Sequence, residues 1–234
     1  MATYVLVHGA WSGAHGFRRV RPLLQAAGHP VFTPSLTGIG ERAHLVSPQV
    51  DLGTHIHDVV NQVLYEGLDD VVLLGFSYGG FVVTGALEHI SAHVRHLVYL
   101  DAFVPDDGDT VLSLAGNPER SLIEIGAPWL VPPTPRDFDD PAEAAFANPR
   151  RVPHPVACFT EPVRLRQRLE AFPFERTYIR ATADAPDAPG TAAFDAAATR
   201  ARSWDAWHYY EIATNHMVPN NRPDELADLL LKMA

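Results

Sequence analysis

Short apolar runs alternate with segments of helical spacing along most of this chain. Val71–Leu74 is a continuous apolar run, and the segment Gly79–His89 that follows it carries apolar residues at helical intervals. Apolar strands separated by helices are typical of a parallel sheet covered on both faces. The expected strands are Tyr4–Val7, Val31–Thr33, Val71–Leu74, Val94–Leu100, Thr177–Ala181 and His208–Ile212. We therefore expect an α/β fold with a mostly parallel, doubly wound sheet.

The alternation of strands and helices breaks between about Pro105 and Pro162, where the chain is rich in proline, glycine and aspartate. Short helices are expected there at Thr110–Leu114 and Ala142–Phe146. A long segment without regular strands that still contains many apolar residues favours an ordered cap. We therefore expect one domain over residues 1–234, with a cap at 105–160 inserted after the strand that ends near Leu100. The helices expected elsewhere are Phe17–Ala27, Asp51–Tyr65, Gly79–His89, one near Pro162–Ala171, Ala192–Arg202 and Pro223–Met233.

The charge and composition exclude several classes of partner. The formal net charge is −10 at pH 7, which disfavours a nucleic-acid partner because phosphate binding needs clustered cations. No apolar run approaches the roughly 18 residues of a membrane span, and the first residues lack the pattern of a signal peptide. The one cysteine, Cys158, forms no intrachain disulfide. We expect no membrane partner and a cytoplasmic location, and a homodimer is compatible with the sequence.

A serine lies at the junction of a buried strand and a helix. Gly75, Ser77 and Gly79 form a G-x-S-x-G pattern in the stretch "LLGFSYGG". In a strand–turn–helix context this pattern indicates a nucleophile elbow, whose strained backbone leaves no room for neighbouring Cβ atoms. The helix N-terminus also favours developing negative charge at the serine. Ser77 is the expected nucleophile.

A serine nucleophile needs a base and an acid later in the chain. His216 follows the last expected strand, in the place of the base. Asp184, after the strand Thr177–Ala181, is the first choice for the acid; Asp101, directly after the strand that ends at Leu100, is the main alternative, and Asp187 is a lesser one. The histidines expected to be solvated or capping residues are His55, His57, His89, His93 and His96.

Two backbone N–H groups are expected to form an oxyanion hole. Tyr78 follows the nucleophile and offers one of them, and Ala10 in the small-residue loop "HGAWSGAHG" offers the other. Five side chains are expected to line a substrate pocket around them, and the ring of Tyr78 is a further possible wall. These five residues are Trp11, Phe76, Phe103, Trp129 and Met217.

The stretches "YVLVHGAW", "GFSYGG", "TYIRATAD" and "NHMVPNNRPDEL" resemble the α/β-hydrolase fold. More narrowly, they resemble the subgroup that includes plant methylesterases, hydroxynitrile lyases and bacterial pyrethroid-hydrolase-like carboxylesterases. The resemblance implies a triad of Ser77, Asp184 and His216 with Ala10 and Tyr78 in the oxyanion hole. Lyase members carry Thr and Lys where this chain has Gly9 and Met217, so the resemblance favours hydrolysis over cyanohydrin cleavage.

The sequence thus predicts a serine hydrolase that cleaves a carboxylic ester of a small to medium apolar substrate through an acyl-enzyme on Ser77. The partner is then a small-molecule ester, and the chemistry needs no metal or organic cofactor. A non-hydrolytic lyase or cyclase on the same fold is one alternative. A ligand-binding protein on a hydrolase scaffold is the other, although binding alone needs no base beside a serine.

Overall fold

Six parallel strands form the central sheet of the computed structural model, which describes residues 1–115, 129–133 and 136–234. Their order across the sheet is β2-β1-β3-β4-β7-β8, and every pairing between neighbours is parallel. The strands are β1 (Thr3–Val7), β2 (Val31–Phe32), β3 (Val71–Phe76), β4 (Val94–Leu100), β7 (Glu175–Ala181) and β8 (Trp207–Ile212). The expected α/β class and parallel sheet are confirmed, and the carboxyl ends of the strands meet along one edge.

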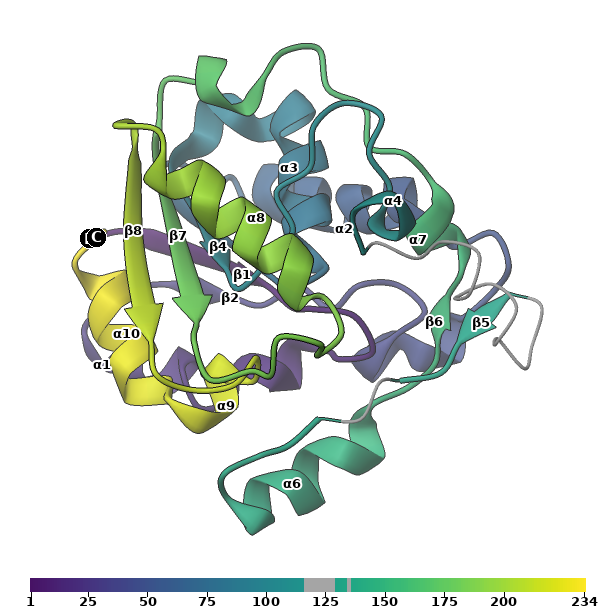
Figure 1. The fold of residues 1–234 in the computed structure, drawn as a ribbon. Coiled ribbons are helices and arrows are strands. Elements are labelled where there is room, and N and C mark those ends of the chain that lie inside the picture. The colour runs from purple at the N-terminus through teal and green to yellow at the C-terminus, as the bar shows by residue number, and fades with distance from the viewer. Residues whose placement is uncertain (116–128, 134–135) are drawn as a thin grey trace.

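Helices cover both faces of this sheet (Figure 1). The two layers are distinguished by their contacts, since α2 packs on α3 and α3 on β3, while α1 packs on α10. The helices outside residues 105–160 are α1 (Arg21–Ala26), α2 (Leu52–Tyr65), α3 (Gly79–Ile90), α8 (Thr191–Arg202), α9 (Val218–Asn221) and α10 (Pro223–Leu231). Short 3₁₀ segments are Ala14–Phe17, Gly40–Leu45, Ser91–His93, Asn148–Arg150 and Leu169–Ala171.

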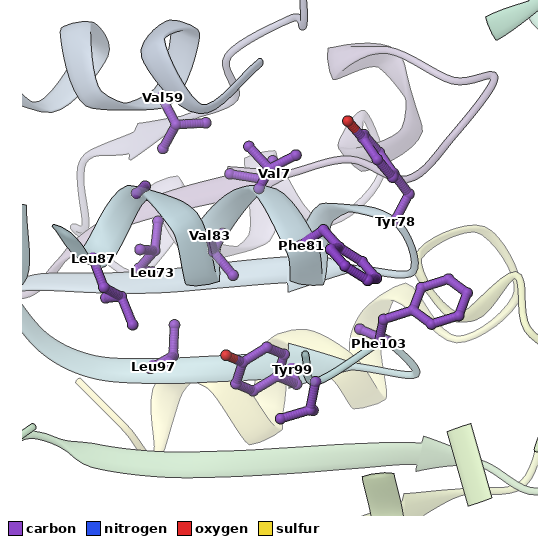
Figure 2. Packing of buried hydrophobic residues seen from close by; sticks show 14 of the residues in the cluster. Val7, Val59, Leu73, Tyr78, Phe81, Val83, Leu87, Leu97, Tyr99 and Phe103 are labelled. Atoms are coloured by element: carbon purple, nitrogen blue, oxygen red, sulfur yellow. The ribbon is translucent and has the colours of Figure 1, made fainter. Parts of the chain in front are cut away.

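Alternate residues of each strand enter different cores, as the two-residue period of a strand requires. In β3, Leu73 faces the core beneath α2 and α3, whereas Leu74 faces the core beneath α1 and α10. Both side chains are fully buried. Figure 2 shows the first core, where Leu73, Val83 and Leu87 pack together between the sheet and α3. Burial on both faces explains why the β3 sequence is continuously apolar.

Residues 105–160 add small elements above the carboxyl edge of the sheet. The described elements there are α4 (Val111–Ala115), β5 (Leu130–Val131), α6 (Pro141–Ala147), β6 (His154–Pro155) and α7 (Ala157–Thr160). The two short helices expected in this region are confirmed as α4 and α6. The strands β5 and β6 form an antiparallel ribbon that the sequence analysis missed. Two-residue strands leave too short a pattern for an alternation of polar and apolar residues to be recognised.

Two expected helices differ from the structure. The segment near 162–171 contains only the 3₁₀ turn Leu169–Ala171. Its backbone N–H groups serve other segments, since Leu165 donates to Asp107 at 2.9 Å and Arg166 to Glu88 at 3.0 Å. The expected helix at 17–27 begins only at Arg21, where a proline in its first turn starts α1. Among the described residues, no helix has the length and apolar character that a membrane crossing requires.

Candidate active site

Ser77 lies in the sharp turn between β3 and α3. Its φ is +57°, in the left-handed region that residues other than glycine rarely adopt. A Cβ atom on Gly75 would lie 2.6 Å from the carbonyl oxygen of Gly79, and one on Gly79 would lie 2.6 Å from that of Val7. The backbones of β1, β3 and α3 therefore approach too closely for side chains at these two glycines. This packing holds the Ser77 hydroxyl at the carboxyl edge of the sheet.

His216 contacts Ser77 from the loop between β8 and α9. Its Nε2 lies 2.9 Å from the Ser77 Oγ, and the imidazole is almost fully buried. The ring is held between two aromatic rings: Phe194 of α8 stacks on it at 5.0 Å and 6°, and the Phe76 ring centroid lies 4.8 Å away. The sequence analysis missed Phe194. The aromatic contacts leave the imidazole little freedom to turn away from Ser77.

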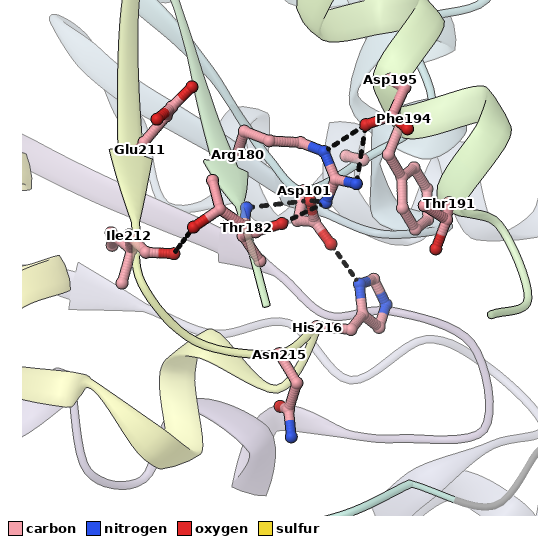
Figure 3. Close-up of polar contacts among 12 residues, drawn as sticks. Asp101, Arg180, Thr182, Thr191, Phe194, Asp195, Glu211, Ile212, Asn215 and His216 are labelled. Carbon is pink, nitrogen blue, oxygen red and sulfur yellow. Dashed lines mark hydrogen bonds and ion pairs between the residues drawn. The ribbon is translucent and has the colours of Figure 1, made fainter. Parts of the chain in front are cut away.

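Asp101 completes a chain of hydrogen bonds through His216. The Nδ1–H of His216 donates to Asp101 Oδ2 at 2.6 Å, so that Nε2 is free to accept the Ser77 proton. The other oxygen, Oδ1, accepts from the Arg180 guanidinium at 2.6 Å and from the Ala181 backbone N–H at 3.1 Å. Asp101 is fully buried, and Figure 3 shows its carboxylate between Arg180 and His216. Asp101 therefore has a partner on each oxygen.

Asp184, the first choice for the acid, does not make this contact. In the described part of the chain, the Nδ1–H of His216 donates to Asp101, and the expectation for Asp184 is corrected. The reason is the register of the sheet: Leu100 pairs with Ile179, and the Asp101 N–H donates to Ile179 at 2.7 Å. This bond turns Asp101 beneath the imidazole, whereas Asp184 lies three residues beyond β7.

Asp184 nevertheless stays close to the site. One oxygen from each carboxylate and one nitrogen of His216 lie within 4.8 Å of one another. The side chains of Asp101, Asp184 and His216 are therefore also a group of potential metal ligands. The Arg180 cation on Asp101 opposes a metal ion here, and binding one would break the hydrogen bond between Asp101 and His216. The arrangement of charges therefore fits proton transfer better than metal binding.

The surroundings of His216 favour its neutral form. Burial lowers the pKa of His216 below its usual value of 6.5, while the hydrogen bond and the charge of Asp101 oppose this shift. The nearby Arg136 cation lowers the pKa further, and Asp184 raises it. Desolvation has the largest effect. A neutral imidazole is the form that can accept the proton of Ser77.

Ala10 and Tyr78, whose backbone N–H groups are expected to form the oxyanion hole, lie beside Ser77 in the structure. Among the described residues, neither Ala10 nor Tyr78 uses its N–H in a hydrogen bond, and both residues line the same pocket as Ser77. His8 holds the loop of Ala10 in place, since its Nδ1–H donates to Gly9 at 2.9 Å and its Nε2 accepts from Leu36 at 3.1 Å. Burial lowers the pKa of His8 to about 4, which keeps both contacts of the neutral ring intact.

The Tyr78 hydroxyl is held by a histidine that was expected to be solvated. His55 is fully buried and its Nδ1 accepts from the Tyr78 hydroxyl at 2.9 Å, while its Nε2–H donates to Thr37 at 2.8 Å. His96 is buried as well, against Thr177 of β7. The expectation for these two histidines is corrected. Histidines on amphipathic segments carry no signal that separates a buried hydrogen-bonded ring from a solvated one.

His55 also belongs to a second group of potential metal ligands. Donor atoms of His55, His154 and Cys158 lie within 4.8 Å of one another, and all three residues are buried. Both ring nitrogens of His55 already have protein partners, and burial raises the pKa of the Cys158 thiol above its usual range. A metal ion would have to break a contact of His55 and ionise a desolvated thiol. This cluster fits a buried polar network.

A pocket of about 200 Å³ opens above Ser77. Its walls are mainly apolar, and the expected residues Trp11 and Phe103 line it together with Phe159 of α7 and Phe194 of α8. Arg136 is the one charged residue among the described residues that line it. The sequence analysis missed Phe159, Phe194 and Arg136, since the sequence alone does not show which face of α7 or α8, or which side of the segment around Arg136, is turned toward the pocket.

Three of the expected pocket residues lie elsewhere. Phe76 packs against His216 on the far side of the imidazole, and Met217 is buried beside it. Trp129 precedes β5, and its carbonyl accepts from the Val156 N–H at 2.9 Å. None of the three lines the pocket. Phe76 belongs to the core beneath α1 and α10, so at the elbow only Ser77 and Tyr78 reach the pocket.

The match with known proteins agrees with this geometry. A family model described as "Alpha/beta hydrolase family" matches residues 4–229. The chain belongs to the alpha/beta hydrolase family. This hydrolase is 38% identical over 244 aligned positions to the carbendazim hydrolyzing esterase of Nocardioides sp. (strain SG-4G), with 98% of each chain covered. It is also 34% identical over 109 residues to the alpha-hydroxynitrile lyase of Arabidopsis thaliana, covering 44% of this chain and 40% of the lyase.

A solved structure extends the likeness to three dimensions. An extracellular alpha/beta-hydrolase from a Paenibacillus species matches with a TM-score of 0.84 at 25% identity, and 99% of this chain and 98% of that chain are covered. That hydrolase is described as sharing structural and functional homology with tobacco salicylic acid binding protein 2. The expected family, its subgroup and the esterase type of enzyme are confirmed by these matches.

The Arg180–Asp101 contact predicts a large loss of stability when the cation is removed. Arg180→Met leaves the fully buried Asp101 carboxylate without its guanidinium, so the free energy of unfolding should fall by about 3 kcal/mol. Urea unfolding followed by circular dichroism measures this loss. Asp195→Asn is the control, because Asp195 is an exposed partner of the same arginine, and it should cost less than about 1 kcal/mol. Equal losses for both variants would contradict the assigned importance of the buried contact.

Proposed function

We propose that this hydrolase cleaves carboxylic esters through an acyl-enzyme on Ser77. The observation that carries the proposal is the continuous set of contacts from Ser77 through His216 to Asp101, at 2.9 Å and 2.6 Å. A serine whose hydroxyl faces a buried, neutral imidazole is an activated nucleophile. Asp101 takes the role of the acid in place of Asp184.

In the first half of the reaction, His216 Nε2 removes the Ser77 proton as Oγ attacks the ester carbonyl carbon. The carbonyl π electrons move to the oxygen, which the N–H groups of Ala10 and Tyr78 stabilise. Asp101 holds the proton on Nδ1 and stabilises the imidazolium that forms. His216 then gives its Nε2 proton to the alkoxide as the C–O bond breaks, and the alcohol leaves.

In the second half, water takes the place of the alcohol. His216 removes a proton from this water, whose oxygen attacks the acyl carbon of the Ser77 ester. The same N–H groups stabilise the second oxyanion. The bond between the acyl carbon and Ser77 Oγ breaks, and His216 returns the proton to the serine. The acid is released and the enzyme returns to its starting state.

The pocket supports small to medium substrates with apolar groups. Its volume of about 200 Å³ and its walls of Trp11, Phe103 and Phe159 suit an acyl or alcohol part of modest size. The full-length relative is named for the hydrolysis of carbendazim, a methyl carbamate with an apolar heteroaromatic ring. Carbendazim is therefore a reasonable first substrate, beside simple 4-nitrophenyl esters.

The lyase alternative has less support. A Cβ atom on Gly9 would lie 2.9 Å from the Ser77 Cβ, so this structure has no room for the threonine that lyase members carry there. Met217 is buried and apolar where they carry a lysine, so it supplies no cation for a departing cyanide. A purely ligand-binding role would leave the contact between Ser77 and His216 without a purpose.

Residues 105–160 act in this proposal as a cap that sets substrate size. The Trp11 indole N–H donates to Val131 of β5 at 3.0 Å, and the Val152 N–H donates to the Trp11 carbonyl at 3.2 Å. The cap is thus tied to the loop that carries Ala10.

Three further predictions come from the sequence: a cytoplasmic location, a homodimer and the absence of nucleic-acid binding. Cell fractionation, light scattering and a nucleic-acid binding assay, respectively, would test them.

Ser77→Ala should lower kcat for 4-nitrophenyl butyrate by roughly 10⁴- to 10⁶-fold, because Ser77 is the one serine among the described residues that line the pocket. A fluorophosphonate probe should label the wild-type protein and fail to label this variant. Ser91→Ala, in the turn after α3, is the matched control and should keep both activity and labelling. Turnover that survives in Ser77→Ala would end the acyl-enzyme mechanism.

The two aspartates should respond differently to the same change. Asp101→Asn should reduce kcat about 10³-fold, since an amide cannot stabilise the imidazolium or hold its proton on Nδ1. Asp184→Asn should reduce it less than about tenfold, because Asp184 affects His216 only through its charge. Steady-state kinetics on one ester compares them. A larger loss in Asp184→Asn would return the acid role to that residue.

The pH profile should show a base of low pKa. Since burial lowers the pKa of His216, the decline of kcat/KM toward acid pH should have its midpoint below 6.5. Acid unfolding must be followed in parallel by circular dichroism. Burial lowers the pKa values of His8 and His55 in the folded protein to about 4. As the pH drops from 6.5 toward 4, the unfolded chain therefore binds protons first, and the free energy of unfolding decreases. A midpoint above 6.5 in folded protein would contradict the prediction.

A further inference from the structure

Arg136 is an unexpected residue for the wall of an apolar pocket. It enters from the stretch between β5 and α6 and shares the pocket with Ser77, Phe103 and Phe194. Its side chain is only partly exposed. A partly buried guanidinium loses hydration that a protein partner normally replaces.

The protein replaces little of that hydration. Among the described residues, Arg136 makes one hydrogen bond, from a terminal nitrogen to the Pro189 carbonyl at 3.3 Å, and no ion pair within 4.0 Å. A guanidinium carries five N–H donors. The carboxylates of Asp184 and Asp101 interact with Arg136 through their charge and make no direct contact. Most of its donors therefore remain available to a ligand.

Arg136 also lies near the reacting groups. Besides lining the pocket above Ser77, it acts electrostatically on His216, the base of the proposed reaction. Elsewhere the described pocket wall is apolar or neutral. An anionic group on a bound substrate would find its one cationic partner at this position, and a planar guanidinium suits a carboxylate because it can donate two parallel hydrogen bonds.

We propose that Arg136 binds a carboxylate of the substrate, so that the preferred esters of this hydrolase carry an anionic group in the acyl or the alcohol part. The inference rests on the proposed ester hydrolysis at Ser77 and adds the substrate class. The apolar walls accommodate the carbon chain between the ester and the carboxylate, and Arg136 fixes the far end.

Matched substrates test this specificity. In the acyl arm, mono(4-nitrophenyl) esters of glutarate, adipate, pimelate and suberate are each compared with the neutral 4-nitrophenyl alkanoate of similar length, after subtraction of spontaneous hydrolysis. In the alcohol arm, 4-acetoxybenzoate is compared with 4-acetoxybenzamide. In at least one arm the wild-type enzyme should prefer the anionic ester by about tenfold or more in kcat/KM.

Variants then assign the preference to Arg136. Arg136→Met should bring the ratio of anionic to neutral kcat/KM close to one, and Arg136→Lys should retain part of it because the charge remains without the planar fork. Arg150→Met is the matched control: it removes a cap arginine that bonds Phe146 outside the pocket, and the ratio should be unchanged. Circular dichroism and fluorophosphonate labelling of Ser77 confirm that each variant is folded.

The outcomes separate the two proposals. Hydrolysis of both ester types with equal ratios in wild type and Arg136→Met would overturn the inference and leave ester hydrolysis standing. A preference for anions that Arg136→Met retains would overturn the inference as well. If no ester of either kind is hydrolysed and Ser77 is not labelled, the proposed function itself fails.

Discussion

The fully buried Asp101 carboxylate is the charge on which the site depends. A carboxylate without solvent is stable only when hydrogen bonds and an opposite charge replace its hydration. Arg180 and the Ala181 N–H supply these to Oδ1, which leaves Oδ2 for His216. The contacts come from neighbouring strands, since Asp101 directly follows β4 and β7 carries Arg180. The position of the imidazole is thus fixed by the pairing of two central strands.

The oxyanion side of the site depends on a different set of contacts, and these join the core to the cap. His8 holds the loop after β1, and Trp11 with φ of +60° extends that loop toward β5. Loop, cap and pocket wall therefore share one hydrogen-bond network. A change in the cap that moves Trp11 would also move the N–H of Ala10. In the proposed mechanism, the contacts of Trp11 therefore connect the cap with the loop that carries the Ala10 N–H.

The sequence predicts what is local and periodic, and misses what depends on register. The strands, the elbow at Ser77 and the position of His216 follow from apolar runs and glycine spacing. The choice between Asp101 and Asp184 does not, because both follow strands that end at the same edge of the sheet. One signal was present: Arg180 is the one charged residue of the expected strand Thr177–Ala181, and a cation inside a buried strand favours a carboxylate beside it. The pocket wall, in contrast, comes from short helices and loops far apart in the sequence, and only tertiary contacts bring their side chains together.

The charges around His216 act against one another in a way that suits a general base. Arg136 and Asp184 shift the pKa of His216 in opposite directions, so their influences partly cancel. Burial and Asp101 remain as the main opposing influences, and desolvation is the larger. The imidazole is therefore neutral at rest, while the carboxylate beside it stabilises the imidazolium that forms when Ser77 attacks. Because the contacts of Asp101 with Arg180 and His216 are already formed in the free protein, the carboxylate does not have to move when the substrate binds.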